Sequence, residues 1–203
     1  MNRLCFRFPI PEMFQAARYL QDALESHLAG DYEKTADSIV AADIPEIGMW
    51  VESIIGKKSS YIQHICTVSD VPVLEKSKRV PIRMPSASEK KKIHEMYGYC
   101  CQFCGTPVIR PEVRDAIRKK YSKALRWWKT NSSRHNAFFA FWAQYDHIIP
   151  HARGGDNSPE NMILTCTACN FGRMNFLLEE VWIDLPTEIK ISWNGWNWLE
   201  KFI

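Results

Sequence analysis

The spacing of apolar side chains in the first quarter of the chain predicts three short amphipathic helices. Apolar residues between positions 14 and 24 recur close to the 3.6-residue period of an α-helix, and Gly30 offers that helix a place to end. A second helix is expected over residues 32–42, and a third over residues 45–56. Two roles stay open for the helices in residues 12–56: packing as a scaffold, or binding a partner protein or a second copy of the chain.

The stretch after these helices has no clear period and contains several prolines among basic residues. It predicts a linker, or a set of short edge strands of which Tyr61–Val68 is one candidate. Ser86 and Glu89 have the spacing of a capping box, so another helix is expected to begin there. We therefore divide the chain into a helical N-terminal region with a basic linker, residues 1–90, and a second domain, residues 91–203.

The composition is that of a folded protein. Of the 203 residues, 46% are hydrophobic, which is enough to bury a core. No apolar run approaches the roughly 18 residues that a membrane helix needs. The basic opening segment is broken by Pro9 and Pro11 and does not resemble a signal peptide. These features predict a cytoplasmic protein with no membrane partner.

The formal net charge of +3 hides an uneven distribution of charged residues. Residues 76–135 carry 16 basic and 4 acidic side chains, whereas residues 1–75 carry 6 and 11, and residues 136–203 carry 4 and 8. A block this basic predicts a surface that binds a polyanion. A solvated helix face would give the same composition, so charge alone does not decide between the two.

Much of this basic block belongs to an insertion, residues 107–142, in which basic and aromatic residues alternate. Pro111 suits the first turn of a helix. Basic residues interleaved with aromatic ones can contact phosphates and stack on bases, and this makes Lys119, Lys123 and Arg126 candidate nucleic-acid contacts. The alternative is that the aromatic rings belong to the core and the basic face is only solvated.

Four of the seven cysteines form two Cys-x-x-Cys pairs, Cys101 with Cys104 and Cys166 with Cys169. In a chain without export signals this spacing predicts a metal site rather than a disulfide framework. Cys100 lies beside Cys101 and competes with it as a ligand, but the two-residue spacing to Cys104 favours Cys101. Four thiolates suit a structural Zn²⁺ ion in a closed tetrahedral site.

The region between and after the cysteine pairs predicts a strand–strand–helix unit. Tyr145–Ile149 and Asn161–Thr165 have the character of strands, Cys166–Leu178 that of a helix, and Gly154-Gly155 that of the loop between the strands. The expected fold class is therefore α+β. It consists of a zinc-stapled ββα core, residues 145–178, with an α-helical N-terminal region and a helical insertion.

The residues on this unit resemble the HNH endonuclease family, also called ββα-metal nucleases. The matched pattern is Asp146-His147-Ile-Ile-Pro150-x-x-x-Gly154-Gly155, then Asn161, then Cys166-x-x-Cys169-Asn170-x-x-Arg173. With the first cysteine pair, the resemblance covers about residues 97–178. It implies hydrolysis of DNA phosphodiester bonds with a single catalytic Mg²⁺ or Mn²⁺, giving 5′-phosphate and 3′-hydroxyl ends.

The resemblance also implies a role for each residue of the pattern. Asp146 and His147 are neighbours on a strand, so their side chains diverge to opposite faces. His147 corresponds to the general base, and neutral imidazole accepts a proton near neutral pH. Asp146 and Asn170 correspond to the ligands of the catalytic ion, because oxygen donors suit hard cations. Asn161 is expected to orient the loop that carries His147 through hydrogen bonds to the backbone.

Further contacts with the nucleic acid are expected around this site. Arg173 lies about one helical turn beyond Asn170 and is expected to contact a phosphate near the ion. Arg153, in the loop between the strands, is a further candidate. For His151 three roles stay open: contact with phosphate, contact with the metal, or simply lining the loop.

The leading hypothesis is an HNH endonuclease that acts on DNA, with RNA left open as a substrate. One alternative is a zinc-stabilised nucleic-acid-binding or adaptor protein without turnover. Another is a nuclease subunit that acts only when a partner binds helices 12–56, and a homodimer is a related possibility. By analogy with small HNH proteins, a role in restriction, phage defence or mobile elements is expected.

Overall fold

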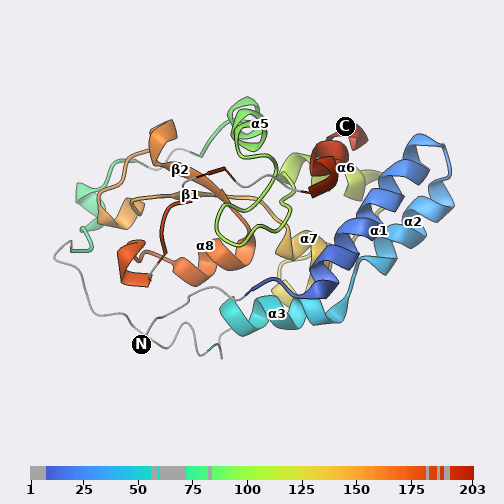
Figure 1. The fold of residues 1–203 in the computed structure, drawn as a ribbon, viewed down its shortest axis with the longest axis horizontal. Coiled ribbons are helices and arrows are strands. Elements are labelled where there is room, and N and C mark those ends of the chain that lie inside the picture. The colour runs from blue at the N-terminus through green and yellow to red at the C-terminus, as the bar shows by residue number, and fades with distance from the viewer. Residues whose placement is uncertain are drawn as a thin grey trace.

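The computed structural model describes residues 8–55, 59, 72–81, 84–181, 183–186, 188–189 and 193–203. The predicted edge strand Tyr61–Val68 lies outside these residues. In chain order, with η for a 3-10 helix, the elements are α1 Pro11–Leu28, α2 Tyr32–Ala41, α3 Pro45–Ile55, η1 Lys76–Lys78, α5 Ala87–Met96, α6 Pro111–Lys120, η2 Asn131–Ser133, α7 Asn136–Ala140, β1 Gln144–His147, η3 His151–Arg153, η4 Pro159–Asn161, β2 Met162–Thr165, α8 Thr167–Arg173, η5 Glu179–Val181 and η6 Trp193–Phe202 (Figure 1).

The three predicted N-terminal helices are confirmed. Gly30 takes a positive φ of 82° between α1 and α2, a conformation open to glycine at little energetic cost. The carboxylate of Asp31 then begins α2 by accepting a hydrogen bond from the backbone N–H of Lys34 at 3.0 Å. α1 packs against α2 and η6, while α3 packs against α7 and α8.

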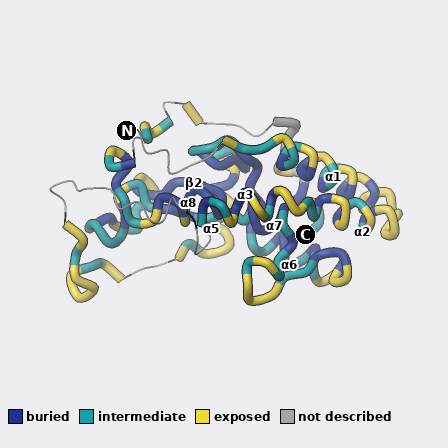
Figure 2. The backbone as a smooth tube through the Cα atoms, turned by 90° about the horizontal axis from the view of Figure 1, so that it is seen from below, coloured by how far each residue is buried: buried dark blue, intermediate teal, exposed yellow. Residues whose placement is uncertain are grey.

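One continuous hydrophobic cluster joins these helices to the rest of the molecule. Its buried members include Leu20 of α1, Ile47 of α3, Phe138 of α7 and Leu164 of β2. Buried stretches of the backbone tube accordingly occur in α3, α7, α8 and β2, separated by exposed positions on the outer sides of the helices (Figure 2). The N-terminal helices therefore serve as a scaffold for the C-terminal half, and they share its core.

A buried polar contact fixes α2 and α3 against the insertion. Asp43, between these two helices, forms an ion pair with Arg126 and accepts a hydrogen bond from the backbone N–H of Asn136 at 2.7 Å. Nε2 of His135 lies 2.8 Å from the carbonyl oxygen of Ile39, and the His135 ring is fully buried. Burial lowers the pKa of His135 to about 4, so this histidine is neutral at pH 7.

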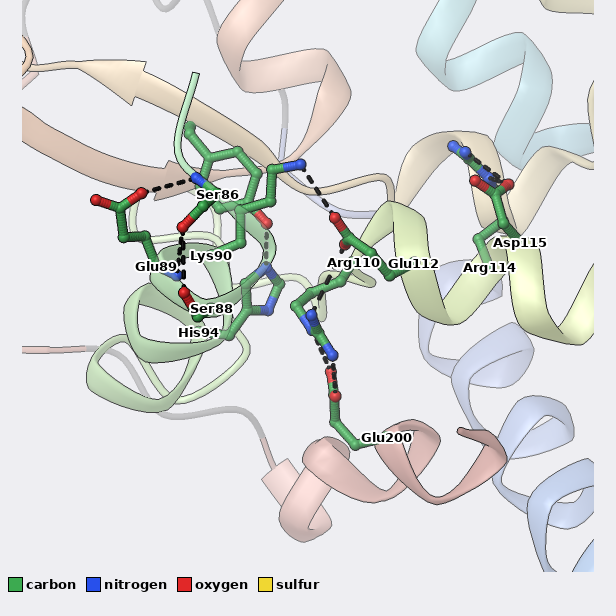
Figure 3. Close-up of polar contacts among 11 residues, drawn as sticks. Ser86, Ser88, Glu89, Lys90, His94, Arg110, Glu112, Arg114, Asp115 and Glu200 are labelled. Atoms are coloured by element: carbon green, nitrogen blue, oxygen red, sulfur yellow. Dashed lines mark hydrogen bonds and ion pairs between the residues drawn. The ribbon is translucent and has the colours of Figure 1, made fainter. Parts of the chain in front are cut away.

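A second group of polar contacts ties together α5, α6 and η6 on the other side of β1 (Figure 3). Lys90 pairs with Glu112 at 3.0 Å, and Arg110 makes a two-pronged ion pair with Glu200 in which Nε lies 2.8 Å from Oε1. The predicted capping box at the start of α5 is confirmed. These contacts brace the segment that leads from α5 to the first cysteine pair.

The strand–strand–helix unit is present, with a shorter helix than predicted. β1 and β2 are antiparallel, and Asp146 pairs with Ile163. α8 ends at Arg173, five residues before the predicted end at Leu178, because Met174 takes a positive φ of 58° that α-helical backbone does not allow. The chain then turns back, and Arg173 Nε donates a hydrogen bond to the carbonyl oxygen of Phe176 at 3.1 Å.

The α+β fold class is confirmed: helices surround a small antiparallel sheet, and four cysteines cluster between the turn after α5 and the start of α8. The insertion is helical at α6 and α7, and most of its aromatic residues are core, as Phe138, Phe139 and Phe141 are all buried. Among the described helices, none has both the length and the apolar character of a membrane span.

Candidate active site and metal centre

The two cysteine pairs meet in space. Cys101 and Cys104 lie in the turn after α5, and Cys166 and Cys169 lie at the start of α8; their four Sγ atoms are all within 4.8 Å of one another. The Sγ atoms of Cys104 and Cys166 are 3.7 Å apart. Four sulfurs bound to one tetrahedral zinc ion at about 2.3 Å would lie about 3.8 Å apart, so the cluster fits a structural zinc. Cys100 is buried but lies outside the cluster, which decides between it and Cys101.

The electrostatics of the cluster favour a bound cation. The pKa of Cys104 lies well below its usual range because the thiols of Cys101, Cys166 and Cys169 donate hydrogen bonds to it. The pKa of Cys166 is raised by its thiol neighbours, and that of Cys169 is raised first by burial. A second thiolate in this buried space is therefore strongly disfavoured until a divalent ion balances the negative charge.

Asp146 points from β1 toward α8 and is held there by Arg173. Its Oδ2 accepts a hydrogen bond from Arg173 Nη1 at 2.9 Å, and its Oδ1 accepts one from the backbone N–H of His147 at 2.8 Å. The Asp146 residue is 8% exposed and Arg173 is fully buried. Burial raises the pKa of Asp146 to about 6, with the Arg173 charge opposing the rise.

Asn170 lies on the same face, one turn before Arg173 on α8. Its Nδ2 donates a long hydrogen bond of 3.4 Å to Oε1 of Gln144, two residues before Asp146 on β1. Gln144 and Asp146 therefore both face α8, where Gln144 contacts Asn170 and Asp146 contacts Arg173. This side of β1 presents a carboxylate and two side-chain amides, the oxygen donors that a hard divalent ion prefers.

His147 points to the other side of the strand, toward the loop that joins β1 to β2. Its Nε2 lies 3.1 Å from Oδ1 of Asn157, and the amide Nδ2 of Asn157 donates to the carbonyl oxygen of Pro81 at 3.0 Å. Because the amide nitrogen faces a carbonyl, the amide oxygen must face the imidazole, so Nε2 carries the proton that it donates. The lone pair of Nδ1 is then left as the basic site of the ring.

Asn161 holds the same loop in place. Its Oδ1 accepts from the backbone N–H of Ile149 at 2.8 Å, while its Nδ2 donates to the carbonyl oxygens of Ile149 and Asp156 at 3.2 and 2.9 Å. These are backbone hydrogen bonds of the kind that the family resemblance predicted for this residue. Gly155 permits the close turn, because a Cβ there would collide with the carbonyl oxygen of Ile149.

A segment that the sequence suggested only as a linker lies across this loop. The backbone N–H of Leu74 donates to the carbonyl oxygen of Ala152 at 2.8 Å, and Nε2 of His151 contacts the carbonyl oxygen of Val80. Together with the contact of Pro81, these contacts fasten residues 72–81 over the loop between β1 and β2. They give His151 a role in lining and holding the loop, one of the three that its position left open.

A cavity of about 220 Å³ opens next to this loop, between α5 and the start of β2. It is lined by Asn157, Pro159 and Met162 on one side, and by Ile93 and Met96 on the other. Asn157 is the hydrogen-bond partner of His147, and Met162 is its partner across the strands. His147 is itself half-buried and does not line the cavity, whereas the carboxylate of Asp146 is enclosed.

Two of the arginines predicted to contact nucleic acid are buried inside the fold, where both are engaged by other groups of the protein. Arg173 is fully buried. Its guanidinium donates hydrogen bonds to the carboxylate of Asp146 and to the carbonyl oxygens of His147 and Ile148. The side chain of Arg153 is 7% exposed and pairs with Glu180. Arg126 is 41% exposed but pairs with Asp43. Of the predicted contacts, the exposed ones are Lys119 and Lys123.

Sequence reasoning did not single out Gln144, Asn157 or the segment 72–81. Gln144 precedes Asp146 by two residues, so the alternation of a strand is a signal that could have placed it on the same face. Asn157 and the segment 72–81 gave no such signal, because their contacts with the site arise only from the way the loops pack.

The arrangement of a β-hairpin and one helix around a cysteine cluster defines a ββα-metal unit, and comparison with protein families agrees. Residues 140–174 match the family model for HNH endonuclease. The match spans β1, β2 and α8, and it indicates nuclease activity and nucleic-acid binding in general. Searches of curated proteins and of solved structures gave no match to the chain.

Proposed function

We propose that the protein is a metal-dependent endonuclease that hydrolyses phosphodiester bonds in DNA, with His147 as the general base. The observation that carries this proposal is the divergence of Asp146 and His147 from adjacent positions of β1. Asp146 faces the polar side chains of α8, whereas His147 faces Asn157 in the loop between β1 and β2. In-line displacement at phosphorus needs two such sides, one for the attacking water and one for the departing oxygen.

His147 performs the proton transfer in this proposal. Oδ1 of Asn157 accepts a hydrogen bond from the Nε2–H of His147. This bond fixes the orientation of the ring, so that Nδ1 can take a proton from water. Asn161 fixes the backbone of the loop, and the segment 72–81 fixes Asn157 from the outside. The role of these neighbours is to position the imidazole, because none of them carries a group that would exchange a proton near neutral pH.

The catalytic ion is assigned to Asp146 and Asn170, with Gln144 nearby. An Mg²⁺ or Mn²⁺ ion held there would stabilise negative charge on the departing 3′-oxygen as a Lewis acid. The donor set fits such an ion in its chemistry, since all three side chains offer oxygen. The Asp146 carboxylate also binds Arg173, so the ion and the guanidinium would have to share its oxygens.

That shared carboxylate favours a second candidate function, a zinc-stapled nucleic-acid-binding protein without turnover. Both oxygens of Asp146 accept hydrogen bonds inside the protein, and the residue is 8% exposed. A nuclease subunit that needs a partner to open this side of the site would look the same. In both cases the pure chain would bind nucleic acid and leave it intact.

Purified protein incubated with supercoiled plasmid and Mg²⁺, with and without EDTA, separates these candidates. The proposal expects nicked or linear product only when Mg²⁺ is available, and linear DNA, single-stranded DNA and RNA assayed in parallel define the substrate. Zinc content is measured before and after EDTA, so that loss of structural zinc is not mistaken for loss of the catalytic ion. Uncut plasmid bound by a zinc-replete protein would favour the non-catalytic candidate.

A further inference from the structure

The stretch from the second half of α6 to the start of β1 carries positive charge without any acidic residue. Residues 116–145 contain seven lysines and arginines and no aspartate or glutamate. Three of the seven contact other parts of the fold: Arg126 pairs with Asp43, Lys120 lies over the ring of Tyr32, and Arg134 packs among aromatic rings. Others lie on the outside of α6 and of the loop after it, among them Lys119, Lys123 and Lys129, which are exposed. Such a surface attracts polyanions.

A tryptophan ring is exposed on this surface. Trp128 is 65% exposed, whereas its neighbour Trp127 is half-buried and packs edge-on against Trp142 with ring centroids 5.6 Å apart. The guanidinium carbon of Arg118, on α6, lies 6.0 Å from the centroid of the Trp128 ring. Tryptophan is enriched at binding interfaces, and an exposed ring next to a cation has the character of a surface on which a base can stack.

The backbone beneath Trp128 is held firmly in place. Arg134 lies over the rings of Trp127 and Trp142, at 5.0 and 5.5 Å from their centroids. Its Nε donates to the carbonyl oxygen of Trp128 at 3.2 Å, and its Nη2 donates to that of Lys129 at 3.4 Å. A ring presented from a fixed backbone loses less conformational freedom on binding than one on a loose loop, which favours affinity.

We propose that this surface binds unpaired nucleotides of the nucleic-acid substrate. It consists of Arg118, Lys119, Lys123, Trp128 and Lys129, which we call the basic tryptophan surface. A base stacks on Trp128 while the cations contact the flanking phosphates, the combination by which proteins hold single strands. In a duplex the base faces are stacked on one another, so its phosphates can contact the cations but no base can stack on Trp128. This inference rests on the proposed function in one respect, namely that the substrate is a nucleic acid.

The basic tryptophan surface is separate from the catalytic residues. α6 packs against η6, and in Figure 1 it lies on the α1 side of the sheet, whereas the orange loop with η3 lies on the opposite side. Trp128 itself contacts Arg118 and is held by Arg134, neither of which contacts Asp146 or His147. Changes on this surface therefore alter binding and leave the proposed catalytic groups in place.

Binding is measured by fluorescence anisotropy with a labelled oligothymidylate and a labelled duplex, in the full chain carrying His147→Ala so that nothing is cut. Trp128→Ala is expected to weaken oligothymidylate binding by about 5- to 150-fold, the range for loss of one base stack, and to change duplex binding little. Trp128→Phe should keep most of the affinity, since it restores a ring at the same place.

Two further variants test the cations. Replacing Lys119 and Lys123 together by glutamine should weaken both ligands and lower the slope of log affinity against log salt by about 1.4 for the single strand. Lys34→Gln, an exposed lysine on α2, is the matched control and should change neither ligand.

The proposal is overturned if Trp128→Ala binds oligothymidylate as tightly as the parent protein, or if it weakens both ligands equally. Competition by polyglutamate as strong as that by oligothymidylate would also overturn it, and would point to an acidic protein partner. Because binding is measured without turnover, these results stand whether or not the wild-type protein cleaves DNA. A folded, non-cleaving protein with intact Trp128-dependent binding would refute only the catalytic proposal.

Discussion

The two candidate metal sites on the ββα unit are built in different ways. The cysteine site is complete in itself: its four sulfurs lie within 4.8 Å of one another, and the Sγ atoms of Cys104 and Cys166 are 3.7 Å apart, close to the spacing in a tetrahedral zinc site. In the carboxylate–histidine site, each group is engaged by another side chain. Arg173 holds Asp146, Gln144 holds Asn170, and Asn157 holds His147.

The difference suggests two roles. The cysteine site would fix the shape of the unit, whereas the side chains of the carboxylate–histidine site could exchange their partners for a ligand. Zinc binding would fix the start of α8 to the turn after α5, whichever substrate is present. The carboxylate–histidine site is held by neutral and ionic hydrogen bonds, which can be exchanged for a cation, a water or a phosphate. If the two sites are independent, a variant of one site should leave the other intact.

The largest effect is expected for Cys166→Ser. Removing one thiolate from a structural zinc site removes much of its binding free energy, which is on the order of 10 kcal/mol in small zinc domains. We expect the variant to lose zinc and to unfold without a cooperative transition, as measured by metal analysis and thermal circular dichroism. Cys100→Ser is the matched control, because Cys100 is buried nearby but outside the cluster. Equal zinc content in both variants would contradict the assignment.

Arg173→Ala is expected to destabilise the other half of the unit. It leaves the carboxylate of Asp146 buried without its ion partner, which costs about 3–5 kcal/mol in the free energy of unfolding. The loss should be larger near pH 8 than near pH 5, because burial already raises the pKa of Asp146 to about 6 and the protonated acid needs no cation.

The control for this change is Arg153→Ala, which breaks the buried pair with Glu180 instead. Denaturant unfolding at the two pH values is the measurement. The Arg173 variant should retain full zinc, which tests the independence of the two sites. Loss of zinc in the Arg173→Ala variant would show that the two sites are coupled.

Acid should loosen the scaffold through His135, away from both sites. Its folded-state pKa of about 4 is below the ordinary value of about 6.5, so between these values the unfolded chain binds a proton that the folded chain does not. The contribution of His135 to stability is therefore full above pH 6.5 and falls by about 1.4 kcal/mol per pH unit down to pH 4. His135→Gln should show a flatter pH dependence of unfolding, and an unchanged slope would contradict this.

The smallest effect is expected for Asn157→Ala. The imidazole of His147 keeps its place on β1 but loses the acceptor that fixes its Nε2 proton, so cleavage should fall by roughly 10-fold, as for other supporting hydrogen bonds. The expected loss is in kcat, with KM unchanged, since Asn157 is proposed to orient a base and not to bind substrate. Asn161→Ala, which frees the loop itself, should reduce cleavage more.

How far the sequence predicted this molecule depended on the range of the interactions. Local signals were reliable: the capping box at Ser86 and Glu89 and the turn at Gly30 lie where the sequence placed them. The cysteine pairs were also predictable across a gap of more than 60 residues, because metal coordination demands a particular set of residue types.

The contacts that the sequence could not show are those decided by packing. Arg173 has the spacing of a phosphate contact on α8, but the helix turns it inward against Asp146. The backbone of residues 72–81 holds the loop between β1 and β2 through its carbonyl and N–H groups, which no sequence motif reveals.

The central claim is tested most directly by comparing wild-type protein with His147→Ala in cleavage of supercoiled plasmid, at equal zinc content and with Mg²⁺ supplied. The account predicts Mg²⁺-dependent cleavage by the wild type and a fall of about 100-fold or more in the variant, the usual loss with a general base, while both bind DNA alike. Plasmid cleavage by the pure variant at the wild-type rate would contradict the account.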